Sequence, residues 1–125
     1  MQNLEFYRPI IPIERAGDDN LNELKISVRY DKGGVNYFSG NQERRGIYVY
    51  FKPVRRSGGM VSCTLLSTNK KEDGFKIFVK ELGRMSQKQM DAVASKIEPL
   101  ADKFASLWDS ENWNAIYSGV MCALE

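Results

Sequence analysis

The strongest constraint on the fold is a change of hydrophobic periodicity along the chain. The middle of the chain contains four segments in which apolar side chains alternate with other residues, the period of a β-strand with one buried face. These segments are residues 24–30, 46–54, 60–66 and 75–81. The stretches 55–59 and 68–74 contain glycine, which adopts positive φ angles at little cost, so both are predicted to be hairpin connections.

After the last of these strands the apolar side chains recur at steps of three and four residues, as on one face of an amphipathic helix. Ser86 and Gln89 form a capping box, which predicts a helix over residues 87–108. Pro99 lacks the N–H that an inner helical position donates, so it is expected to kink this helix or to split it in two. A second, shorter helix is predicted after the candidate cap Asn112.

Two segments are less regular. Residues 31–45 are too many for a tight turn and are interpreted either as a mobile loop or as a loop with a short additional strand at residues 35–38. Residues 1–23 contain Pro9 and Pro12 among isoleucines. This composition indicates an extended arm whose isoleucines dock on the body of the protein or on a partner.

These elements predict an α+β fold in a single domain of 125 residues, a length at which the core needs neither a metal nor a disulfide. The expected architecture is an antiparallel sheet of four or five strands with a long helix packed on one face. Residues 24–108 make this unit of sheet and helix. The arm at 1–23 precedes it, and a short helix within 109–125 follows it as part of the same domain.

Few residue types that carry catalysis are present. The chain has no histidine, which removes the commonest general base and the commonest zinc ligand, and its two cysteines lie in no metal-binding or nucleophile motif. We therefore expect a protein that is not an enzyme and that uses no metal and no cofactor.

No apolar run approaches the roughly 20 residues of a membrane span. The N-terminus also lacks the layout of a signal peptide, so a cytoplasmic location is expected.

The charge of the chain is unevenly distributed. The whole sequence has a net charge of +2, but residues 24–88 hold 14 lysines and arginines against five acidic residues, whereas both flanking segments are acidic. The basic centre is also the part that is predicted to form the sheet. A basic sheet favours an anionic partner.

Strand alternation assigns the side chains of this centre to two faces. One face receives three apolar side chains from each strand, which predicts the core beneath the long helix. The other face receives basic and aromatic side chains and no acidic one. Its charged and aromatic members are predicted to be Lys25, Arg29, Tyr48, Tyr50, Lys52, Lys76, Phe78 and Lys80. Further positive charge falls at the strand ends, on Arg44, Arg45, Arg55, Arg56, Lys70 and Lys71.

This mixture suits single-stranded nucleic acid, because cations neutralise the phosphates and aromatic rings stack on unpaired bases. Duplex DNA is less well served, since no basic recognition helix is predicted. We predict a nucleic-acid-binding surface made of the eight side chains of this face together with Arg55 and Arg56. The alternative is a structural or protein-interaction domain, in which the aromatic side chains pack under the arm, under the terminal helix or in a dimer interface.

Four antiparallel strands followed by a long helix, with basic and aromatic residues on the exposed face of the sheet, resemble a known class of module. This is the single-stranded-DNA-binding module of the positive-cofactor-four and Whirly class of transcriptional regulators, and the resemblance covers about residues 24–108. The resemblance implies a homodimer that binds unpaired DNA across the sheet and without a cofactor, whereas the residues themselves are compatible with single-stranded DNA or RNA. It also implies a role in transcription regulation and places the same eight side chains on the binding surface.

Overall fold

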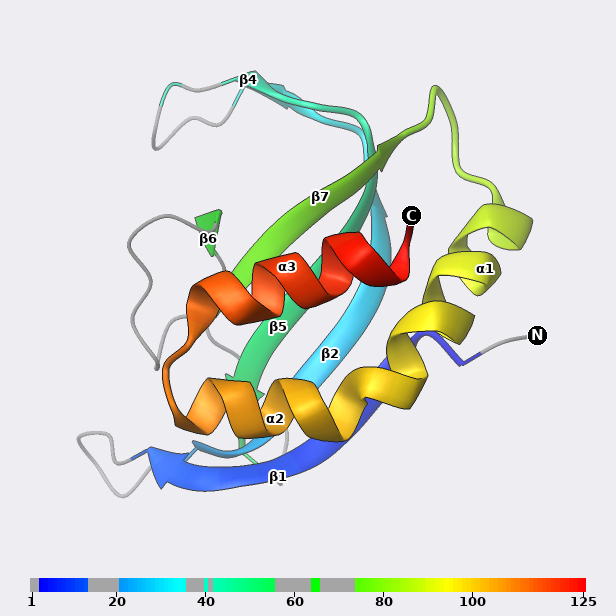
Figure 1. The fold of residues 1–125 in the computed structure, drawn as a ribbon. Helices are drawn as coiled ribbons and strands as arrows, with labels where there is room; N and C mark the ends of the chain where they lie inside the picture. Colours follow the sequence, from blue (N-terminus) through cyan, green and yellow to red (C-terminus); the bar gives the residue numbers. More distant parts are fainter. Residues whose placement is uncertain (1–2, 14–20, 36–39, 41, 56–63, 66–73) are drawn as a thin grey trace.

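The computed structural model describes residues 3–13, 21–35, 40, 42–55, 64–65 and 74–125. Strands come first along the chain and helices follow, so the fold is α+β, as the sequence predicts (Figure 1). The strands are β1 (Glu5–Ile13), β2 (Leu21–Asp31), β3 (Gly34–Val35), β4 (Gln42–Glu43), β5 (Gly46–Val54), β6 (Thr64–Leu65) and β7 (Phe75–Glu81). The helices are α1 (Gln87–Ile97), the 3₁₀ helix η1 (Glu98–Leu100), α2 (Ala101–Asp109) and α3 (Trp113–Ala123).

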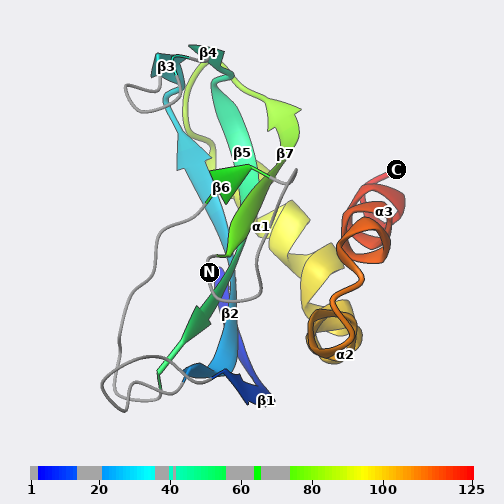
Figure 2. The ribbon, with the colours of Figure 1, turned by 90° about the vertical axis from the view of Figure 1, so that its left-hand side faces the viewer.

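The main sheet has the strand order β1-β2-β5-β7-β6. Its first four strands are antiparallel neighbours, and the two-residue β6 adds to β7 in parallel. The short strands β3 and β4 pair with each other at the end of the β2–β5 hairpin. All the helices lie on one side of the main sheet (Figure 2). The opposite side therefore faces away from the helices.

The N-terminal segment is a strand of the sheet rather than a separate arm. β1 pairs with β2 from Glu5 opposite Ser27 to Ile13 opposite Leu21, with an irregularity between Pro9 and Ile13. Ile10 is buried in the core, whereas Ile11 is exposed. Proline is tolerated in β1 because it is an edge strand. The backbone N–H groups on its outer side have no neighbouring strand as a partner, so a proline there removes no hydrogen bond of the sheet.

The strand predicted at residues 60–66 takes a different place from the one expected. The two hairpin predictions around it fall largely outside the described residues, as do residues 60–63 and 66. β5 pairs directly with β7, and the described part of the segment, β6, lies beyond β7. The fourth antiparallel strand is therefore β1, which pairs with β2 on the side opposite to β5.

The helical region follows its local signals. Pro99 splits the predicted helix into α1 and α2, with η1 between them. The predicted caps are confirmed, since Ser86 Oγ accepts from Gln89 N at 3.3 Å and Asn112 Oδ1 accepts from Ala115 N at 3.2 Å. Each cap satisfies one of the donors that a helix start leaves without an internal partner.

The core fills the space between the sheet and the helices. Trp108 on α2 is fully buried, and its ring stacks on Phe75 of β7 at 5.6 Å between centroids and meets Trp113 edge-on at 4.9 Å. Phe51 on β5 stacks on Phe75 as well, at 5.3 Å. These aromatic contacts join two central strands to α2 and α3, so the helices hold the sheet on this side.

Among the described residues, no helix combines the length and the apolar character that crossing a membrane requires.

Candidate functional site

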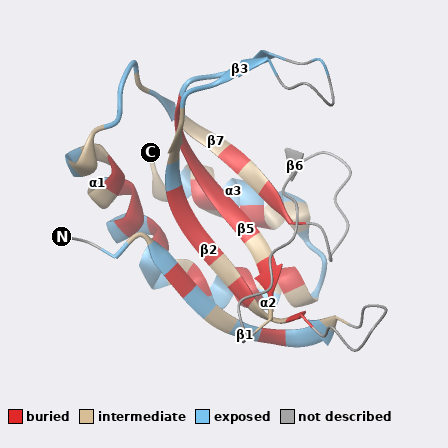
Figure 3. Ribbon diagram, turned by 180° about the vertical axis from the view of Figure 1, so that it is seen from behind, coloured by how far each residue is buried: buried red, intermediate tan, exposed pale blue. Residues whose placement is uncertain are grey.

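Most of the predicted site residues alternate along β2, β5 and β7 with the buried core residues, so they lie on the side of the sheet that faces away from the helices, the side viewed in Figure 3. We call this surface the basic aromatic face. Cross-strand register aligns its members, with Lys25 opposite Lys52, Arg29 opposite Tyr48, and Tyr50 opposite Lys76. Its described members are Lys25, Arg29, Tyr48, Tyr50, Lys52, Lys76 and Phe78.

The aromatic side chains of this face form a cluster rather than three separate platforms. The Tyr48 ring meets Phe78 edge-on at 5.3 Å and lies 6.3 Å from Tyr50. Tyr48 is only 2% exposed and Tyr50 8%, whereas Phe78 is half-buried. The prediction that all three rings are open to bases is therefore wrong for the two tyrosines. Strand alternation predicts the face of the sheet on which a side chain lies, but it does not predict which other groups cover that side chain.

Cations lie over these rings. The Arg29 guanidinium is 5.4 Å from the centroid of Tyr50, and the Lys52 ammonium is 5.8 Å from the same ring. Arg44, which follows β4, lies 4.2 Å from the ring of Phe78. A cation at such a distance is attracted by the negative face of the ring, which holds a long side chain in place. Arg29 and Arg44 are both exposed, and the Arg44 guanidinium also lies 3.8 Å from the Glu81 carboxylate, so Arg29 offers its charge most directly to a ligand.

Carboxylates also reach the cations of this face, which corrects the prediction that it carries no acid: Glu5 pairs with Lys25, Glu81 with Arg44, and both Asp31 and Glu43 with Lys76. Lys76 Nζ lies 2.8 Å from Glu43 Oε1 and 3.5 Å from Asp31 Oδ2, and its side chain is only 13% exposed. The Tyr50 hydroxyl donates to Asp31 Oδ2, and the Tyr48 hydroxyl donates to the carbonyl of Arg44 at 2.7 Å. Asp31, Glu43 and Arg44 come from the segment interpreted as a loop, so alternation could not assign their faces.

The outer members of the site are less tightly held. Lys25 makes a 3.4 Å ion pair with the half-exposed Glu5 of β1, a kind of surface pair that contributes little to stability. Arg55 is half-buried just beyond β5, and Arg56 lies outside the described residues. The described cations thus extend along β2 and β5 from Arg29 toward Lys25 and Lys52.

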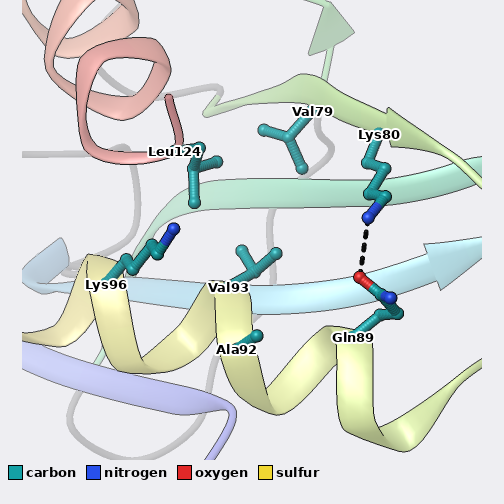
Figure 4. A pocket seen from close by; sticks show the side chains of 7 residues that line it. All are labelled: Val79, Lys80, Gln89, Ala92, Val93, Lys96 and Leu124. Carbon is teal, nitrogen blue, oxygen red and sulfur yellow. Dashed lines mark hydrogen bonds between the residues drawn. The ribbon is translucent and has the colours of Figure 1, made fainter.

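Lys80 does not belong to the basic aromatic face, contrary to the prediction. Ile47 opposes Lys80 while Tyr48 opposes Phe78, so Val79 is the extra residue of a β-bulge. The bulge reverses the alternation, and Lys80 Nζ donates to Gln89 Oε1 of α1 at 2.7 Å (Figure 4). There it lines a small open cavity of about 130 Å³ between β7 and α1. Lys96 and Leu124 share this cavity with the side chains Val79, Gln89, Ala92 and Val93.

The environment of the buried polar groups shifts two pKa values. Burial by itself lowers the pKa of Lys76, but its hydrogen bond to Glu43 and the charges of Glu43 and Asp31 outweigh burial, so the pKa is raised above 10.5. Burial raises the pKa of the Tyr48 hydroxyl above 10.0, although the charge of Lys76 opposes this. Both groups therefore hold their protons more tightly in the folded state than in the unfolded chain.

This sign predicts a loss of stability in alkali. A group whose pKa is raised by folding stabilises the protein fully below its unfolded-state pKa, and this contribution disappears as the pH rises through the folded-state value. We expect the thermal midpoint to fall as the pH is raised above about 10, where free tyrosine and lysine side chains titrate. Circular dichroism melts would measure the fall, which should be smaller in Tyr48→Phe. The exposed Tyr117→Phe is the matched control, and an equal fall in both variants would contradict the prediction.

Within the described ranges, no three or more His, Cys, Asp or Glu side chains gather in a group that could hold a metal ion. No protein-family model, no curated protein and no solved structure matches this chain. The arrangement itself therefore carries the functional argument: an α+β domain with a sheet face that points away from the described helices and on which cations lie over aromatic rings.

Proposed function

We propose that the protein binds single-stranded nucleic acid, DNA in preference to RNA, on the basic aromatic face and catalyses no reaction. The observation that carries this proposal is the position of Arg29 and Lys52 over Tyr50 and of Arg44 over Phe78. Cations that are already held over rings lose less side-chain entropy when they contact a phosphate. Three such contacts on the side away from the helices are suited to a flexible phosphate chain.

The mode of binding differs from simple stacking on three open rings. Arg29, Lys52 and Arg44 bind phosphates, and the half-buried Phe78 adds an aromatic contact for a base beside Arg44. Tyr50 acts beneath Arg29 and Lys52 by holding both cations in position. Affinity in this arrangement comes mainly from charge, so it should depend strongly on salt and little on sequence.

The order of the strands supports the same proposal. Strands β1, β2, β5 and β7 form an antiparallel sheet that precedes the helices, which agrees in outline with the positive-cofactor-four and Whirly class, although β1 lies outside residues 24–108, on which the resemblance rests. The resemblance further predicts a homodimer with a role in transcription regulation, and the sequence predicts a cytoplasmic location. Sedimentation of the free protein and of its complex with an oligonucleotide would test the dimer.

Replacing both Arg29 and Lys52 by alanine should weaken binding to a fluorescein-labelled single-stranded oligonucleotide about 60-fold at about 50 mM salt. This figure follows from two lost phosphate contacts at a salt slope of about 0.7 each. The slope of log affinity against log salt should fall by about 1.4 for the same reason. Fluorescence anisotropy at about 50 mM and about 200 mM salt measures both quantities.

The matched control is the double variant Lys88→Ala, Lys103→Ala, which removes the same charge from exposed positions on α1 and α2. It should retain nearly the affinity and the salt slope of the wild type. An equal loss in this control, or unchanged anisotropy for the wild type at micromolar protein, would rule the proposal out.

The alternative function is a structural or protein-interaction domain. It is favoured by one observation, the burial of Tyr48 and Tyr50, which is also what a packed structural face requires. A wild-type protein that leaves the anisotropy of the labelled oligonucleotide unchanged at low salt would support this alternative. A surface that binds phosphates through exposed cations binds most tightly at low salt, so binding would be detected there.

A further inference from the structure

The contact between the β3–β4 hairpin and the sheet joins opposite charges on the basic aromatic face. Asp31 ends β2, Glu43 lies on β4, and both carboxylates reach Lys76 on β7. These residues are 45 and 33 positions apart from Lys76 in the chain. Asp31 and Lys76 both belong to the main sheet, so the charge contact between the β3–β4 hairpin and that sheet is the one between Glu43 and Lys76.

Lys76 is the central cation of this face. It lies 4.9 Å from the ring centre of Tyr48 and 5.6 Å from that of Tyr50, on the strand next to β5. Unlike Arg29, it is largely buried, and its ammonium is occupied by two carboxylates. A phosphate oxygen and a carboxylate oxygen make the same kind of charge-assisted hydrogen bond to an ammonium group. Asp31 and Glu43 thus occupy the positions that phosphate oxygens would take at Lys76.

We propose that the contact of Asp31 and Glu43 with Lys76 is autoinhibitory, so that a nucleic-acid phosphate must displace these carboxylates to reach the central lysine. This inference rests on the proposed function and concerns the regulation of the same site. Three further contacts hold Asp31 and the residue that follows Glu43 in place. The Tyr50 hydroxyl donates to Asp31, the Tyr48 hydroxyl donates to the Arg44 carbonyl, and the Arg44 guanidinium covers the Phe78 ring.

The consequence is that affinity is limited by the protein's own acids. In the closed arrangement Lys76 contributes little net positive charge to the face, because two carboxylates neutralise it and repel phosphate. Displacement of the two carboxylates frees the Lys76 ammonium for a phosphate. Binding by the exposed Arg29 would precede this step, since the Lys76 side chain is only 13% exposed.

The test is the double variant Asp31→Asn, Glu43→Gln, which keeps the shape of both side chains and removes their charge. It should bind the labelled single-stranded oligonucleotide about tenfold more tightly than the wild type at about 50 mM salt, with a salt slope larger by about 0.7, the value for one added phosphate contact. Adding Lys76→Gln to the double variant should abolish both gains. This dependence on Lys76 separates a freed lysine from a general rise in net charge.

The control for charge alone is the double variant Glu111→Gln, Glu125→Gln, which removes the same two charges from exposed positions. Far-UV circular dichroism confirms that each variant is folded. If the wild type binds and Asp31→Asn, Glu43→Gln binds no more tightly than this control, the autoinhibitory contact is wrong and the proposed function stands. If neither the wild type nor the Asp31→Asn, Glu43→Gln variant binds, both proposals fail. Binding by the wild type that is tighter in Asp31→Asn, Glu43→Gln than in the control supports both.

Discussion

Replacing Trp108 with alanine is expected to lower the free energy of unfolding by about 3–5 kcal/mol, the usual cost of removing a buried large aromatic side chain. Trp108 is 0% exposed and packs against both Phe75 and Trp113, so no neighbour on either side can fill the space without giving up its own contacts. Domains of this size are stable by only about 5–15 kcal/mol. Urea denaturation followed by far-UV circular dichroism would measure the loss.

A second variant on the helical side serves as the comparison for Trp108. Tyr117 on α3 is 44% exposed, and its replacement by alanine should cost about 1 kcal/mol or less. Equal losses for the two variants would show that the stacked rings of Trp108, Phe75 and Trp113 do not form the centre of the core.

Replacing Gly46 with alanine is expected to cost about 3 kcal/mol, near the upper end of the ordinary range for one substitution. A Cβ atom at this position would lie 2.0 Å from the backbone carbonyl oxygen of Lys80 and 2.9 Å from the Cα of Glu81. These are backbone atoms of the neighbouring strand, so they cannot move aside as a side chain would. The strands β5 and β7 must therefore separate next to the bulge at Val79.

Gly83 provides the matched control for Gly46, because a Cβ atom there would meet nothing within 4 Å. Gly83→Ala should leave the urea midpoint nearly unchanged. If Gly46→Ala were as stable as Gly83→Ala, the close approach of β5 to β7 at Lys80 would be wrong.

Much of the fold could be predicted because its signals are local. The period-two segments at 46–54 and 75–81 became β5 and β7 with the same bounds. Pro99 divided the helix because a missing N–H breaks helical hydrogen bonding whatever surrounds it. The N-terminal strand was interpreted as an arm because its two prolines disfavour a central strand, and only the pairing with β2 shows that it occupies an edge.

The candidate site was predicted in part. Alternation placed Arg29 and Lys52 on the same face of the sheet as Tyr50, and their contacts with that ring agree with this placement. It failed at Lys80, because a single extra residue in β7 turns every following side chain to the other face. It could not find Asp31 and Glu43, which lie in a segment without a clear period.

The sequence by itself determined strands β5 and β7, the helices with their break at Pro99, and the uneven distribution of charge. These properties depend on the backbone geometry and side chains of neighbouring residues, which a linear pattern contains. Only the tertiary structure decided that Tyr48 is buried, that Lys80 faces α1 and that Lys76 is held by two carboxylates. Such contacts depend on strand register and on the path of a hairpin, which distant residues set together.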